Sequence, residues 1–147
     1  YGAELAAKLY DKGVPAVLCT RWEQASFDEL RKYRPKLPSL LRPDDLDAES
    51  LLRSFEAVIR ELAGEFAVQR RPWRTQVHVV EVAKQEPTPV FYIDLPSWPE
   101  KEIIRLLLSD LPTRMQDILE DDKRLHAMVN LGAETAADLY FIEWEES

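Results

Sequence analysis

The stretch from Val14 to Pro43 constrains the fold more than any other, because it places a polar segment between two short apolar runs. The first run, residues 14–19, ends at Thr20, and the second, residues 39–41, ends at Arg42. Such runs, bounded by proline and separated by a helical segment, are typical of parallel strands in a β-α-β unit. Parallel strands end at the same edge of a sheet. We therefore expect the Thr20 hydroxyl and the Arg42 guanidinium to be neighbours, an arrangement that suits an anion such as a phosphoryl group.

Helical patterns surround this unit. Apolar residues recur at helical spacing in residues 2–12, where Leu5 is expected to face inward, and in residues 48–63. The polar segment 22–33 contains a short predicted helix for which Ser26 is a plausible N-cap. The first 64 residues are therefore predicted to form an α/β domain with a parallel β-α-β-α order.

The pattern changes after Gly64, and residues 65–147 are predicted to form a second, smaller domain. Alternating apolar residues predict a hairpin, and a proline at the first helical position predicts a helix. In order, we expect strands at residues 75–82 and 90–93, a helix at 98–119 bent at Pro112, and strands at 125–131 and 139–144. This order predicts an α+β domain with antiparallel strands and one bent helix.

The net charge of −8 is unevenly distributed along the 147 residues. Residues 1–64 carry 11 acidic and 10 basic side chains, whereas residues 65–147 carry 16 acidic and 9 basic ones. An acidic second half argues against nucleic acid as a partner, because the phosphate backbone would be repelled.

Neither a membrane nor an oxidising compartment is expected for this chain. No apolar run approaches the roughly 20 residues that cross a bilayer, and no basic start with an apolar centre indicates a signal peptide. The single cysteine, Cys19, excludes an internal disulfide and favours a cytoplasmic location. We expect Cys19 to be a buried, inert strand residue, with a nucleophilic role as the alternative.

A basic and aromatic cluster opens the second half: Arg70, Arg71, Trp73 and Arg74. These side chains could bind an acidic partner, or phosphate with a stacked base. The alternative is a solvated linker whose tryptophan packs against the following domain.

Three further polar residues lie on predicted strands of the second half: His78, Asp94 and His126. Two imidazoles and a carboxylate could form a metal site or part of a catalytic set. No His-x-x-x-His spacing, nucleophile motif or glycine-rich phosphate loop accompanies them. The solvent-facing side of a half-open sheet is therefore the favoured location, and no metal site is predicted.

Residues 2–62 resemble the C-terminal half of a bacterial two-component response-regulator receiver domain. The resemblance depends on the helix from Gly2, the apolar run ending in Thr20, and Arg42-Pro43 followed by an acidic loop and a leucine-rich helix. It implies a flavodoxin-like fold in which Thr20, Arg42 and Pro43 form a phosphoryl switch. The phosphorylated Asp and the Mg²⁺-binding acids of the family would lie before Tyr1. No cofactor is therefore expected within these residues, and Mg²⁺ only if an upstream portion carries the acidic pocket.

Two positions depart from the receiver pattern. Arg42 stands where the family has lysine, and Ser39 stands where many members have an aromatic residue. A planar guanidinium does not replace a point charge equivalently. A degenerate receiver that is regulated by binding is therefore the alternative to phosphorylation.

The resemblance implies a signalling protein of the phosphorelay class that acts through protein contacts rather than as an enzyme. Its expected partners are a sensor kinase or another signalling protein, and a second copy that binds residues 26–62. Because the chain opens at Tyr1 without methionine, we expect an N-terminal portion to be absent. The hypothesis from another class is a small α/β enzyme or anion-binding protein with its site at Thr20 and Arg42.

Overall fold

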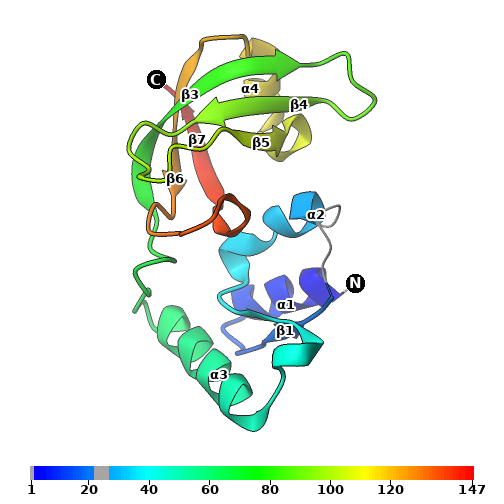
Figure 1. Cartoon of the computed structure of the whole chain (residues 1–147), viewed down its shortest axis with the longest axis vertical. Coiled ribbons are helices and arrows are strands. Elements are labelled where there is room, and N and C mark those ends of the chain that lie inside the picture. The colour runs from blue at the N-terminus through cyan, green and yellow to red at the C-terminus, as the bar shows by residue number, and fades with distance from the viewer. Residues whose placement is uncertain (1, 22–26) are drawn as a thin grey trace. The chain divides into compact units, whose positions relative to one another are not determined.

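The computed structural model describes residues 2–21 and 27–147, which belong to two compact units. Unit 1 is Tyr1–Arg70 and unit 2 is Arg71–Ser147 (Figure 1). The division falls after Arg70 rather than after Gly64, because the Arg70 side chain is buried in unit 1. In the described ranges, no helix is long and apolar enough to cross a bilayer.

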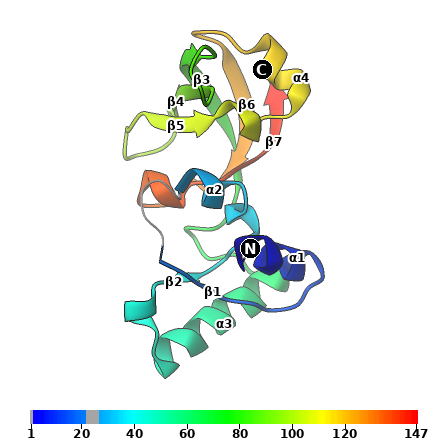
Figure 2. The ribbon, with the colours of Figure 1, turned by 90° about the vertical axis from the view of Figure 1, so that its right-hand side faces the viewer.

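Unit 1 combines helices with one small parallel sheet. Its elements are α1 (Gly2–Asp11), β1 (Leu18–Cys19), α2 (Phe27–Arg31), η2 (Arg34–Lys36), β2 (Leu40–Leu41), η3 (Pro43–Asp45) and α3 (Ala48–Leu62). The predicted parallel pairing is confirmed, since Leu18 lies opposite Leu40 and Cys19 opposite Leu41. Both strands lie between α1 and α3 in the ribbon views (Figures 1 and 2).

The first strand is shorter than predicted. It begins at Leu18 rather than Val14, because the amide of Val14 donates a hydrogen bond back to the Leu9 carbonyl and prolongs the turn that ends α1. Pro15 then has no amide hydrogen to offer a neighbouring strand. The proposed N-cap Ser26 lies outside the described residues.

The core of unit 1 is small and rich in alanine. In α1 the buried side chains are alanines, and the prediction that Leu5 faces inward is wrong, since Leu5 is exposed. The core cluster consists of Ala3, Ala6, Leu30 and Leu37, with Leu18, Tyr33 and Leu40 packed against it. Small side chains let α1 approach its neighbours closely but bury little apolar area.

Helix α3 begins with a side-chain cap. The Ser50 amide donates to Asp47 Oδ1 at 2.7 Å, and this hydrogen bond lowers the pKa of Asp47 from its ordinary value. The helix buries Val58 and leaves much of its apolar stripe exposed. The predicted helix at residues 48–63 is thus confirmed, but its apolar face is only partly covered within unit 1.

Unit 2 is built on a five-stranded antiparallel sheet. Its strands are β3 (Trp73–Ala83), β4 (Val90–Asp94), β5 (Ile104–Leu107), β6 (Arg124–Val129) and β7 (Phe141–Glu146), in the order β5-β4-β3-β6-β7. The hairpin and the two later strands predicted from the sequence are present.

The bent helix predicted for residues 98–119 is wrong over its first part. Ile104 and Leu106 are buried while Arg105 between them is exposed, which is the alternation of a strand, and β5 pairs with β4. Trp98 is fully buried, and its Nε1 donates to the Ala133 carbonyl at 2.9 Å. The helical part is the short α4 (Thr113–Ile118), which follows a 3-10 turn, η4 (Leu108–Asp110).

One continuous core lies between the sheet and the segment that contains α4, which covers one face of the sheet (Figure 1). Its largest fully buried members are Trp98, Phe91, Ile93, Leu95, Ile104, Met115, Leu125 and Leu139. The opposite face carries polar side chains of the strands, among them Arg74, His78, Asp94 and His126.

Candidate functional site

The ends of β1 and β2 bring Thr20 and Arg42 to adjacent positions. The Thr20 amide donates to the Leu41 carbonyl at 2.9 Å, so the backbone ladder continues one step past β1. Arg42 follows Leu41 directly and is exposed, whereas Thr20 is half-buried. A hydroxyl and a guanidinium at neighbouring strand ends provide the donors that an anion requires.

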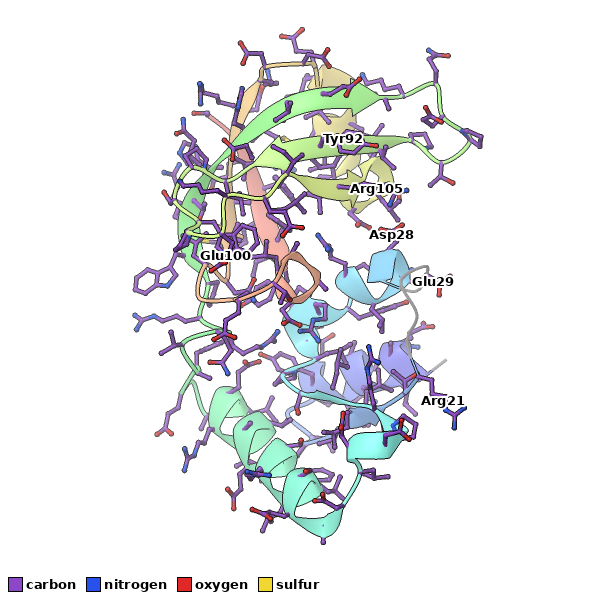
Figure 3. All side chains as sticks on the ribbon, in the orientation of Figure 1. Arg21, Asp28, Glu29, Tyr92, Glu100 and Arg105 are labelled. Carbon is purple, nitrogen blue, oxygen red and sulfur yellow. The ribbon has the colours of Figure 1, made fainter. Side chains whose placement is uncertain are left out.

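A second cation, which the sequence reasoning overlooked, follows the first strand. Arg21 comes directly after Thr20 and projects outward from the chain (Figure 3). Its position directly after an apolar run and Thr20 was the sequence signal that could have identified it. Asp44 and Asp45 in η3 lie just beyond Arg42 and are exposed. The strand ends therefore combine one hydroxyl and two guanidinium groups with a nearby acidic turn.

Pro43 opens η3 as its first residue. A proline at that position fixes the backbone angle φ and turns the chain away from β2. Its role is therefore to set the direction in which the chain leaves the strand end beside Arg42.

Cys19 does not occupy the buried position expected for it. It is exposed, since in β1 it is Leu18 that packs against the core cluster of unit 1. The thiol is therefore accessible.

Arg70 is buried, whereas the other three residues of the basic and aromatic cluster are exposed. Its guanidinium contacts both carboxylate oxygens of Glu61, with Nε 2.9 Å from Oε1 and Nη2 3.1 Å from Oε2. It also donates to the carbonyls of Arg34 and Pro35 at 2.8 and 3.0 Å. These contacts lie inside unit 1, so the side chain is directed inward rather than into a solvated linker.

The other three residues of the cluster belong to unit 2. The Arg71 guanidinium stacks 4.5 Å from the centre of the Trp73 ring, and the indole remains 49% exposed. Arg74 points to the polar face of the sheet and lies 3.3 Å from Glu145. The exposed part of the cluster is therefore a stacked Arg-Trp pair with a separate, ion-paired arginine.

His78 lies on the polar face of β3 beside two carboxylates. Its Nε2 is 2.6 Å from Asp122 Oδ1, and Asp94 is its cross-strand neighbour. The hydrogen bond with His78 holds the pKa of Asp122 below its ordinary value. This hydrogen bond connects β3 to the turn before β6, so its role is to hold the turn against the strand.

His126 lines a small cavity on the same face. The cavity measures about 30 Å³, room for one or two water molecules, and is bordered by Arg74, Ala127, Met128, Glu143 and Glu145. The His126 Nδ1 atom is buried there without a hydrogen-bond partner in the described part of the chain. Across residues 2–21 and 27–147, no three His, Cys, Asp or Glu side chains form a group that could hold a metal ion.

Two further residues of the polar face were not among the site residues predicted from the sequence. Tyr92 on β4 and Arg105 on β5 are paired in register and lie side by side (Figure 3). Arg105 was assigned to a helix, so its alignment with Tyr92 could not be anticipated.

Comparisons with known proteins identify no relative of this chain. No family model matches it, and neither the curated proteins nor the solved structures contain a match.

Proposed function

We propose that this chain is a response-regulator-like signalling protein that acts through protein–protein contacts. The observation that supports it most is the parallel register of β1 and β2, because it makes Thr20 and Arg42 neighbours at one sheet edge. A phosphoryl group recognised there would be hydrogen-bonded by the hydroxyl and the guanidinium. Unit 2 then serves as the output or association module.

Helix α3 supplies the contact surface of this proposal. Its apolar residues recur with alternating spacings of four and three, at Ala48, Leu52, Phe55, Ile59 and Leu62. Leu52 is 60% and Ile59 52% exposed. Exposed leucine and isoleucine at heptad spacing favour pairing with another helix, and a second copy of the chain would supply an identical stripe.

Light scattering on the purified chain at high concentration tests the dimer. We expect twice the 17.1 kDa mass of one chain. Leu52→Lys should weaken association roughly thirtyfold, the effect of losing a hot spot of about 2 kcal/mol. Ala57→Lys, on another side of α3, is the matched control and should leave the mass unchanged. A wild-type monomer at high concentration would refute the dimer.

The phosphoryl part of the proposal has its own test. The product of the native gene is incubated with Mg²⁺ and a small phosphodonor, and its intact mass is measured before and after. Gain of one phosphoryl group supports a working receiver. No gain, together with a dimer that depends on Leu52, supports the degenerate receiver.

An anion-binding function is the second candidate, because Arg21 and Arg42 flank Thr20 at the strand ends. It predicts that inorganic phosphate shifts the NMR signal of the Thr20 amide. Arg42→Gln should abolish that shift, whereas Arg53→Gln, which removes an exposed arginine of α3, should not. A Thr20 signal that does not respond to phosphate contradicts this function.

A further inference from the structure

The outer side of β1 presents backbone groups that β2 does not use. The Thr20 amide donates to the Leu41 carbonyl, so the backbone of Thr20 faces β2. Because neighbouring strand residues point their amides to opposite sides, the amides and carbonyls of Val17 and Cys19 point away from β2. In residues 2–21 and 27–147, no other strand pairs with β1. β1 is therefore an edge strand with unused hydrogen-bonding groups.

The apolar side chains of this small sheet are incompletely covered within unit 1. Leu18, Leu40 and Leu41 are only half-buried, although they form most of its two strands. Cys19 at the end of β1 is exposed. Isolated two-stranded sheets are marginally stable, and further strands or helices that cover the apolar face stabilise them. A strand added beside β1 would therefore stabilise unit 1.

The edge of β1 suits a strand identical to itself. Residues 14–20 contain no charged side chain, so an antiparallel second copy of this segment places no like charges opposite each other. The second copy carries the same unused amides and carbonyls, and each set can satisfy the other. Association about a two-fold axis, in which both copies supply the same surface, is the commonest form of assembly.

We propose that β1 pairs antiparallel with β1 of a second copy, so that the two small sheets join into one continuous sheet. Leu18 then lies opposite Leu18 of the second copy. In this register each Cys19 amide donates to the Val17 carbonyl of the other copy, and each Val17 amide donates to the other Cys19 carbonyl. This inference rests on the homodimer of the proposed function and adds a backbone contact to it.

The edge contact is compatible with the proposed contact through α3. Both strands lie between α1 and α3 in the ribbon views, so α3 lies on one side of the sheet (Figures 1 and 2). Antiparallel strands of one sheet are related by a two-fold axis perpendicular to the sheet, which keeps corresponding helices on the same side. The two α3 helices then share one side of the joined sheet, and a single dimer can use both contacts.

Light scattering on Cys19→Pro tests the edge contact. Proline removes the outward amide of residue 19 but no hydrogen bond between β1 and β2, and edge strands tolerate it at such positions. The Cys19 side chain is exposed, so little packing is lost. We expect the dissociation constant of the dimer to rise about tenfold, because each copy loses one hydrogen bond. Cys19→Ser, which keeps the amide, is the matched control and should associate like wild type.

Hydrogen exchange on the wild-type chain provides a second test that requires no variant. The Cys19 amide should exchange about tenfold more slowly at concentrations where the dimer forms than at concentrations where it dissociates. The Thr20 amide, which bonds to Leu41 within one chain, is the internal control and should be protected at both concentrations. A Cys19 exchange rate that does not change with concentration would overturn the inference.

The result for Leu52→Lys separates this inference from the proposed contact through α3. If Leu52→Lys weakens association while Cys19→Pro behaves like Cys19→Ser, the helix contact stands and the edge contact is refuted. If Cys19→Pro weakens association while Leu52→Lys does not, the edge contact stands and the helix contact is refuted. A wild-type monomer at high concentration refutes both contacts.

Discussion

Unit 2 buries a continuous apolar core between its sheet and the segment that contains α4, whereas unit 1 combines a small alanine-rich cluster with a buried ion pair. Apolar burial stabilises in proportion to area and does not require a precise direction. A buried ion pair stabilises only when both partners are present and well oriented. The comparison indicates that the stability of unit 2 comes mainly from apolar burial, while the stability of unit 1 depends more on a few directional contacts.

Trp98→Ala should have the largest effect, about 3–5 kcal/mol less stability for unit 2. The change creates a cavity at a fully buried position and removes the hydrogen bond to the Ala133 carbonyl. Urea unfolding monitored by far-UV circular dichroism measures the loss. Trp73→Ala, at a half-exposed indole, is the control and should cost far less. Equal losses of stability in Trp98→Ala and Trp73→Ala would contradict the contrast between core and surface positions in unit 2.

Glu61→Ala should destabilise unit 1 by about 3–4 kcal/mol, because it leaves the Arg70 guanidinium buried without its carboxylate. The double variant Glu61→Leu with Arg70→Met sharpens the comparison, since replacing both ions with apolar side chains is often neutral. We expect it to unfold near the wild-type urea midpoint. A double variant as unstable as Glu61→Ala would show that unit 1 requires the hydrogen bonds themselves.

The smallest predicted effect is a pH dependence in unit 2. The hydrogen bond with His78 lowers the pKa of Asp122, so its stabilising contribution is present above pH 3.8 and is lost as pH falls through the lowered value. Asp122→Asn, which tolerates the left-handed backbone at this position, should be less stable than wild type near neutrality and equally stable in strong acid. Glu120→Gln, at an exposed position two residues before Asp122, is the control, and its stability relative to wild type should not change with pH in this way. A difference in stability between Asp122→Asn and wild type that does not change with pH would contradict the stabilising role of the ionised Asp122.

Local patterns in the sequence were sufficient to predict a helix or strand where one face of that element is buried. The alternation from Val77 to Val82 predicts β3 because one side of that strand meets the core. The parallel pairing of β1 with β2 was likewise predictable, since two short apolar runs separated by a helix have few other arrangements. The adjacent positions of Thr20 and Arg42 follow from that pairing.

The segment Ile103–Leu108 shows where such patterns fail. A run of apolar residues interrupted by one arginine fits both a helix and a strand, and the preceding proline favoured the helix. Pairing with β4 decided the outcome, because Ile104 and Leu106 both reach the core only in an extended chain. That pairing is a long-range property which no local window contains.

By itself the sequence determined the division into an α/β and a mainly antiparallel part, the strand ends at Thr20 and Arg42, and the amphipathic α3. Hydrophobic periodicity and turn residues depend on a few neighbouring positions, so they can be recognised in the sequence alone. Only the tertiary structure decided that Cys19 is exposed, that Trp98 is buried and that Arg70 turns inward. Burial of Arg70 depends on a carboxylate and two carbonyls from separate elements, and their convergence exists only after the chain has folded.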